Sequence, residues 1–333
     1  MAIPRNLVYV FACVILFAFL GMLFIVYTER DLKSFISMDG SSELVVRENL
    51  VVHPLFEHLK NAVPAIDAIP YLDADDITPK KFYQEYLTNS LPFTMVDGCR
   101  DWPAFELWQN LSYLGEHFGN RSVLVMKLGQ SADQSETRTM FGKRYTFGEF
   151  VNLTGAVDAK GNQQLYYVRN EMLFSRTLAA DIVRPVFISK ALRSRHTGLT
   201  VWPSFDDRKP EFSNRERYVC VVAGIEEFRL VSPVFKQNLY SGVLEELRPN
   251  ETPLDFFKNV NESQFPLFKE AKVLRQILTP GDCLFIPAFY WSQSMTHHEI
   301  PSDMSVFVTF EYESHSEMLN LLFEAIDQGV LEN

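Results

Sequence analysis

The chain has 333 residues, of which 47% are hydrophobic and 22% are charged, and its formal net charge at pH 7 is −11. This composition is typical of a folded protein and excludes a disordered or low-complexity chain. An acidic chain without a basic tract is also a poor match for nucleic acid, which binds positive surfaces that displace its counterions. We therefore expect no nucleic-acid partner.

The N-terminal segment is almost uncharged, with Arg5 the only charged side chain before Glu29. After a short tail (residues 1–6), residues 7–27 form an apolar run of 21 residues. As a helix this run would span about 31 Å, which matches the hydrocarbon core of a bilayer. The residues that follow lack the small side chains of a signal-peptidase site. The sequence therefore predicts an uncleaved signal anchor, whose partner is membrane lipid.

The side of the membrane on which the body lies is indicated by glycosylation sequons rather than by flanking charges. Arg5 on one side is matched by Arg30 and Lys33 on the other, so charge does not orient the helix. Five Asn-x-Ser/Thr sequons follow the anchor, more than chance predicts, although unused surface asparagines remain an alternative. We expect a single-pass type II membrane glycoprotein with a lumenal or extracellular body. The sequon residues are Asn110, Asn120, Asn152, Asn250 and Asn261.

The remainder divides into a stem (residues 28–63), a folded body (64–313) and a C-terminal helix (314–333), which begins at a Ser-x-x-Glu capping box. The first part of the body carries helix signals at Pro79, at Asn110 and over residues 146–153. Short strands separated by turns follow from about residue 199. Helices followed by many short strands predict a mainly β fold with helical decorations on one side. The expected strands cover residues 93–96, 122–128, 218–223, 227–231, 273–278, 283–286 and 305–312.

The cysteines leave two alternatives open. Cys13 lies in the expected membrane helix, which leaves Cys99, Cys220 and Cys283 in the body. We expect three buried thiols, because Cys220 and Cys283 lie in apolar strand runs, with one disulfide plus one free thiol as the alternative. No Cys-x-x-Cys is present, so neither a cysteine zinc site nor a thioredoxin-type redox centre is expected.

Three stretches of the body carry a family resemblance. The first combines residues 92–98 (PFTMVDG) and 101–104 (DWPA), and the second leads from residues 222–224 (VAG) to 228–233 (FRLVSP). The third is PGDCLFIPA at residues 280–288, followed by Tyr290 and Trp291. Together they resemble the JmjC or cupin-like domain of the iron and 2-oxoglutarate oxygenase superfamily. The resemblance implies a double-stranded β-helix, a jelly-roll barrel with an open mouth, preceded here by one transmembrane helix.

The resemblance also implies a site that binds Fe(II) through a His-x-Asp/Glu pair and a later histidine, next to a basic residue for 2-oxoglutarate. The pair corresponds to Trp202 and Ser204, in a register that leaves about nine extra residues before Gly224. The later histidine corresponds to Ser292 and the basic residue to Glu226. Indole and hydroxyl groups do not replace imidazole and carboxylate on iron, and a carboxylate repels the cosubstrate. We therefore expect no catalytic residue and no cofactor, and a pseudoenzyme that binds a protein partner or a ligand.

Two other functions remain open. In the first, the chain is an active Fe(II)/2-oxoglutarate-dependent protein hydroxylase with an atypical metal site. The sequence offers His297 and Glu299 as a His-x-Glu pair for such a site, although they follow the third stretch, in the wrong chain order for the paired ligands. In the second, the body binds a glycan or a metabolite without a metal.

Overall fold

The computed structural model describes residues 60, 64–127, 142–154, 165–172, 176–203, 208–241, 250–297 and 304–313. The expected membrane helix and the expected C-terminal helix lie outside these residues, as does the stem apart from residue 60. Within the described residues, no helix combines the length and the apolar character needed to cross a membrane. The anchor therefore stays a prediction.

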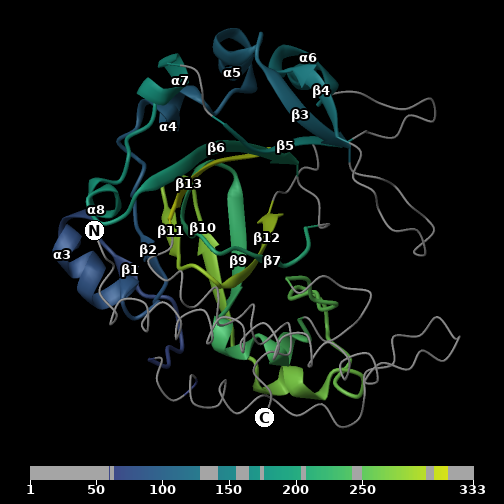
Figure 1. Cartoon of the computed structure of the whole chain (residues 1–333). Helices are drawn as coiled ribbons and strands as arrows, with labels where there is room; N and C mark the ends of the chain where they lie inside the picture. Colours follow the sequence, from purple (N-terminus) through teal and green to yellow (C-terminus); the bar gives the residue numbers. More distant parts are fainter. Residues whose placement is uncertain are drawn as a thin grey trace, which may run out of the picture.

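The described strands form two sheets (Figure 1). The larger sheet contains β1 (Tyr71–Leu72), β2 (Phe93–Met95), β3 (Ser122–Lys127), β4 (Lys143–Thr146), β5 (Tyr166–Met172), β6 (Ser194–Pro203), β8 (Glu216–Ala223), β11 (Cys283–Ile286) and β13 (Met304–Tyr312). The smaller sheet contains β7 (Glu211–Phe212), β9 (Ile225–Val231), β10 (Val273–Leu278) and β12 (Trp291–His297). The strand orders are β1-β2-β11-β8-β13-β6-β5-β3-β4 and β10-β9-β12-β7.

The chain passes back and forth between these sheets, as a jelly-roll barrel requires. From β6 onward each strand lies in the opposite sheet from the one before it, except for the hairpin of β9 and β10. Gly224 turns the chain from β8 into β9 with a φ of 83°, a conformation that glycine adopts without steric cost. The mainly β, cupin-like architecture expected from the sequence is confirmed.

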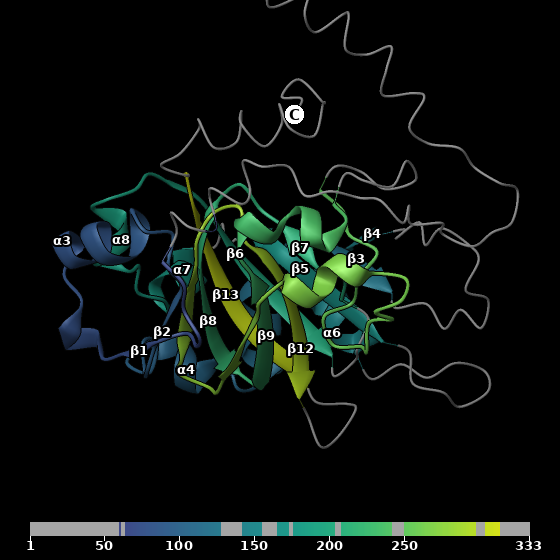
Figure 2. The same cartoon turned by 90° about the horizontal axis from the view of Figure 1, so that it is seen from below.

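Inward-facing residues of both sheets fill part of the space between them. Because successive side chains of a strand point to opposite faces, alternate residues of β8 and β9 enter this core. The packed side chains come mainly from β8, β11 and β13 of the larger sheet and from β9 and β10 of the smaller one, and Figure 2 shows β9 beside β8 and β13. The buried residues of this inner cluster are Ile69, Val219, Val221, Phe228, Leu230, Leu274, Leu278, Leu284, Ile286, Tyr290 and Phe307.

Helices cover the other face of the larger sheet (Figure 1), where Phe82, Trp108, Phe147 and Phe310 belong to one buried cluster. Local signals explain where several of them begin. The side chain of Asn110 accepts a hydrogen bond from the Ser112 backbone N–H (2.8 Å) at one helix start. The helices are α3 (Pro79–Lys81) with the π-helical turn η2 (Phe82–Leu87), α4 (Pro103–Leu107), α5 (Leu111–Phe118), α6 (Phe147–Leu153), α7 (Arg176–Ala180) and α8 (Val186–Ser189).

Short 3₁₀ turns cover the outer face of the smaller sheet and the start of the domain. On the smaller sheet they enclose a third buried cluster, which includes Trp291, Tyr240 and Phe265. The barrel is thus buried on both outer faces, and its interior is the place left for a ligand. The turns are η1 (Ala74–Asp76), η3 (Pro233–Phe235), η4 (Gln237–Leu239) and η5 (Pro266–Glu270).

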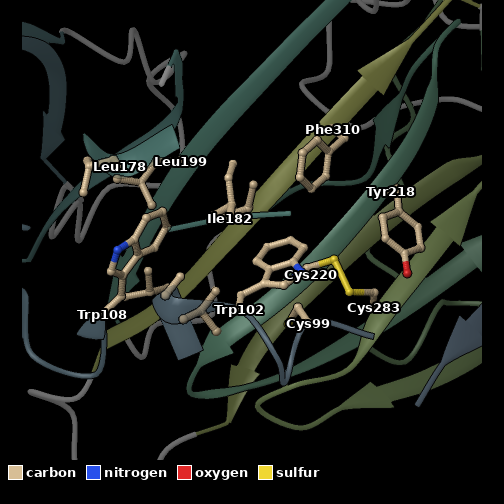
Figure 3. Packing of buried hydrophobic residues seen from close by; sticks show 14 of the residues in the cluster. Cys99, Trp102, Trp108, Leu178, Ile182, Leu199, Tyr218, Cys220, Cys283 and Phe310 are labelled. Atoms are coloured by element: carbon tan, nitrogen blue, oxygen red, sulfur yellow. A yellow bond between two sulfur atoms is a disulfide. The ribbon is translucent and has the colours of Figure 1, made fainter. Parts of the chain in front are cut away.

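The cysteines correct the expectation of three buried thiols. Cys220 of β8 and Cys283 of β11 are direct partners in the antiparallel register and form a disulfide (Figure 3). Cys99 lies beside them as a buried free thiol, whose Sγ donates to the Val221 carbonyl (3.4 Å). Burial raises the pKa of the Cys99 thiol to about 12, so it stays protonated and unreactive. Cys220 and Cys283 are buried in apolar strands, as expected. The register of β8 against β11 places them opposite each other and so determines that they pair.

Candidate functional site

The barrel contains a cavity of about 270 Å³ between the two sheets. One part of its wall is apolar and includes Val219, Phe228, Ile286 and Phe307, which belong to the inner cluster. The rest of the wall is polar. Its polar and charged lining residues are Arg169, Asn170, Thr200, Arg208, Lys209, Glu211, Ser213, Arg217, Ser292, Ser294, Thr309 and Glu311.

Strand β12 places the position expected for the third metal ligand in this cavity. Ser292 and Ser294 line the cavity, whereas Trp291 belongs to the cluster outside the barrel. Trp202, from β6 in the opposite sheet, also lines the cavity and is only 3% exposed. Ser204 lies outside the described residues. The structure thus brings two of the three expected metal positions to the same cavity.

Strand β7 offers a second register for the expected ligand pair. The Cα partner of Ser292 across this strand pair is Glu211, and both Glu211 and Ser213 line the cavity. Removing the nine extra residues of the register through Trp202 moves the two positions to 211 and 213. Glu211 on this strand and Ser213 directly after it are well placed to share a site with Ser292. The nine extra residues before Gly224 were the sequence signal that pointed to a register nearer to Gly224. The pairing of β7 with β12 is the structural observation that supports it.

The cavity does not fit iron in either register. Among its described lining residues there is no histidine. Glu211 is engaged in an ion pair with Arg169, and Glu311 accepts hydrogen bonds from Arg215 (2.5 Å) and Asn170 (2.8 Å). Serine hydroxyls and paired carboxylates do not supply the imidazole and free carboxylate ligands of a non-haem iron site.

The described residues that come close enough together to hold a metal are three cysteines outside the cavity. Their sulfur atoms lie within 4.8 Å of one another. Two of them, Cys220 and Cys283, are joined as a disulfide, and Cys99 is a protonated thiol. Thiolates are the form in which cysteine binds metals, so this oxidised cluster is not a metal site.

The alternative ligand His297 lies on the outer face of the smaller sheet, on the same side as Trp291. Its Nε2 is 3.1 Å from Glu227 Oε2, and Arg275 and Arg229 donate to the same carboxylate at 2.8–3.0 Å. Hydrogen bonds from Arg275, opposed by burial, set the pKa of Glu227 at about 2. Two guanidinium groups repel a cation at this carboxylate. Glu299 lies outside the described residues.

The position expected for the 2-oxoglutarate anchor contains a buried ion pair. Glu226 is fully buried, and its carboxylate accepts two hydrogen bonds from Arg208, at 2.8 and 3.3 Å. The same guanidinium donates to Ser294 (2.8 Å) and Thr296 (2.5 Å) and lies over the Trp202 ring, 4.9 Å from its centre. The anchor position is thus negative, and its counter-charge comes from the protein. It does not fit the carboxylate of 2-oxoglutarate.

Arg217 is a second cation of the cavity, on β8. Its Nη2 donates to Ser292 Oγ (3.0 Å), and its Nε is buried without a hydrogen-bond partner. Burial lowers its pKa, and the nearby carboxylates of Glu211 and Glu311 oppose that shift. Sequence reasoning missed both Arg208 and Arg217, because an isolated arginine in a strand or loop carries no motif.

The five sequon asparagines are all exposed. Their exposure permits glycosylation, but any surface asparagine is exposed, so the modification stays a prediction. Asn110 also caps α5 through its side-chain oxygen, which leaves its amide nitrogen available.

Comparison with known proteins matches residues 79–318 to a family described as the cupin-like domain. The chain is 26% identical over 266 residues to the Jumonji C domain-containing protein 5 of Drosophila melanogaster, covering 78% of this chain and 63% of that protein. It is 24% identical over 294 residues to the lysine-specific demethylase 8 of Xenopus tropicalis (84% of this chain, 62% of that protein). It is also 25% identical over 266 residues to the tRNA wybutosine-synthesizing protein 5 of Gallus gallus (73% and 77%). The chain spans 63% or less of the length of four such relatives.

Proposed function

Because the chain belongs to the cupin-like domain family, we propose that it keeps the family's barrel as a binding domain and has lost iron-dependent catalysis. The observation that carries this proposal is the ion pair of Arg208 with Glu226 at the cosubstrate anchor. Because the protein itself supplies the counter-charge of Glu226, removing either partner would leave the other charge buried and uncompensated. Arg208 and Trp202 line the polar part of the cavity. A bound dianion would need a free cation there, but the charge of Arg208 is already matched by Glu226.

The metal positions support the same proposal. Ser292 donates or accepts a hydrogen bond but is a poor ligand for Fe(II), and here it accepts from Arg217. The neighbouring Glu211 is paired with Arg169. A metal that entered the cavity would have to displace two guanidinium groups and would gain no imidazole.

We also propose that the protein is a type II membrane protein with its body in the secretory lumen or outside the cell. The apolar run of residues 7–27 supports the anchor, and five exposed sequon asparagines support the lumenal side. The Cys220–Cys283 disulfide adds support, because disulfides form and persist mainly in oxidising compartments. The expected partners are membrane lipid for the anchor and a protein or small ligand for the barrel.

The test uses the full chain, purified from membranes in detergent. Iron content by elemental analysis and conversion of 2-oxoglutarate to succinate are measured together, with the lysine-specific demethylase 8 relative, purified in the same way, as the positive control. We expect less than about a tenth of an iron per chain and no turnover above a protein-free blank. Stoichiometric iron with turnover would overturn the proposal.

An active oxygenase is the second candidate, and the names of the relatives favour it. Two of them are called lysine-specific demethylases and one a tRNA wybutosine-synthesizing protein. On this alternative the chain is an Fe(II)/2-oxoglutarate-dependent protein hydroxylase with an atypical metal site. Turnover in the experiment above supports it directly.

A further inference from the structure

Three residues that line the cavity have side-chain N–H groups that lack an acceptor. In the described part of the chain, the Nε1 of Trp202 and the Nε atoms of Arg208 and Arg217 are buried and have no hydrogen-bond partner. All three residues line the same cavity. Buried donors in folded proteins are almost always bonded, so a group of them around one cavity indicates a missing acceptor.

Arg217 has a positive charge that no described carboxylate pairs directly. Its hydrogen bond within the described residues is the one to Ser292 Oγ, which leaves the hydroxyl proton of Ser292 free to donate in turn. Three carboxylates lie in its neighbourhood, and each is engaged elsewhere. Glu211 pairs with Arg169, Glu311 with Arg215, and Glu216 accepts from the Ala288 backbone N–H (2.7 Å).

The cavity complements a ligand with one apolar and one polar end. Val219, Phe228, Ile286 and Phe307 form the apolar wall, while Arg217 and Ser292 belong to the polar one. The volume of about 270 Å³ is far larger than the 10–15 Å³ that one water needs, so a small organic molecule fits.

From these donors, charges and surfaces we infer that the cavity binds a small monocarboxylic acid with an apolar or aromatic body. The carboxylate is received by Arg217, with the indole N–H of Trp202 and the hydroxyl of Ser292 as further donors. A guanidinium and a carboxylate form paired, charge-assisted hydrogen bonds, which explains why this group is preferred over a neutral acceptor. The inference rests on the proposed function, because it requires a barrel whose interior is free of iron and 2-oxoglutarate.

The same surroundings select against ligands of higher charge. Arg217 compensates one negative charge on the ligand, whereas a second one is left uncompensated in a cavity that Glu211 and Glu311 also line. Phosphate, which is a mixture of monoanion and dianion at neutral pH, and dicarboxylates should therefore bind more weakly than a monocarboxylate. The charge of Arg208, which also lines the cavity, is already matched by Glu226.

The test is calorimetric titration of the metal-free full chain with benzoate, using benzamide as a ligand of the same shape without the charge. We expect benzoate to bind at one site and benzamide to bind at least about tenfold more weakly. Arg217→Met should weaken benzoate by at least about tenfold, and Trp202→Phe, which keeps an aromatic ring and removes the indole N–H, should weaken it severalfold. The matched control is Arg195→Met, because Arg195 pairs with Glu313 at the surface and should leave benzoate binding unchanged.

Equal benzoate affinity in Arg217→Met and wild type, or no binding at millimolar benzoate, would overturn the inference. Tighter binding of phosphate or 2-oxoglutarate than of benzoate would overturn it as well. Thermal unfolding of each variant shows whether it is folded. If Arg217→Met does not fold, the benzoate affinity of Trp202→Phe tests the inference instead. Iron with 2-oxoglutarate turnover refutes the proposed function itself. If the protein is metal-free and inactive but its affinity for benzoate is unchanged by Arg217→Met, only this inference is refuted.

Discussion

The buried Arg208–Glu226 pair makes a strong prediction, because its two charges compensate each other away from water. The Glu226 side chain is 0% exposed and that of Arg208 is 7% exposed. Glu226→Gln preserves the shape of the side chain and removes its charge. The guanidinium of Arg208 then stays buried next to the hydroxyls of Ser294 and Thr296, without a counter-charge.

The size of the effect follows from these contacts. Removing one partner of a buried ion pair costs about 3–5 kcal/mol of unfolding free energy, because the other charge is left uncompensated. The amide oxygen introduced by Glu226→Gln can still accept one hydrogen bond, and the Trp202 ring offers Arg208 a cation–π contact at 4.9 Å. We therefore expect a loss near the lower end, about 3 kcal/mol. Replacing both partners by apolar residues, as in Arg208→Met with Glu226→Leu, should cost less than about 1 kcal/mol.

Urea unfolding of wild type, the single variant and the double variant measures these differences, provided the slope of the transition is unchanged. Glu262→Gln is the matched control, because Glu262 pairs with Lys269 on the surface with both side chains more than half exposed. That control should lose less than about 1 kcal/mol. A loss below about 1 kcal/mol in Glu226→Gln would refute the view that the former anchor position is now structural.

Three further predictions concern the disulfide, the outer ion cluster and the compartment. Cys220→Ala with Cys283→Ala opens a link across 63 residues and should lower the unfolding free energy by about 4 kcal/mol in urea; unchanged stability would contradict it. The pKa of Glu227 is lowered from 4.5 to about 2, so its stabilisation is complete above pH 4.5 and is lost as the pH falls toward 2, by roughly 3 kcal/mol. Unfolding followed against pH should show this acid limb in wild type and lose it in Glu227→Gln, and identical profiles would exclude the assigned role. Enzymatic deglycosylation of the full chain from animal cells should lower its apparent mass, with no shift once the five sequon asparagines are replaced; an unshifted wild type would contradict a lumenal body.

Local signals predicted much of the scaffold. The helix expected to begin after Asn110 is α5, and the short helix expected at residues 146–153 is α6, capped by Thr146 and Glu149. The expected strands at residues 218–223, 273–278 and 283–286 correspond to β8, β10 and β11. Each of these elements depends on neighbours within a few residues along the chain, which is why sequence alone reaches them. Strand β12 has a weaker signal, because hydroxyl side chains occupy every second position from Ser292 to Thr296.

The sequence identified only part of the candidate site. Ser292 and Glu226 were identified from the family resemblance. The sequence alone shows that Ser292 stands where a histidine is expected and Glu226 where a basic residue is expected. Arg208 lies 18 residues from Glu226 in the chain, and no periodicity links the two. The register of β7 against Ser292 likewise depends on the pairing of distant strands. Contacts between residues far apart in sequence are set by the folded topology, which spacing does not encode.

Residue identity was enough to establish the apolar N-terminal run and the acidic body, and the family resemblance of three short motifs indicated the cupin-like fold and a serine, Ser292, at an expected iron-ligand position. The folded arrangement of strands was needed to show that Cys220 faces Cys283 and that Arg208 neutralises Glu226. It was also needed to show that Arg217 bonds a serine hydroxyl rather than a carboxylate in the barrel. Charge compensation depends on distance and burial, and both arise when strands from two sheets are brought together around one cavity.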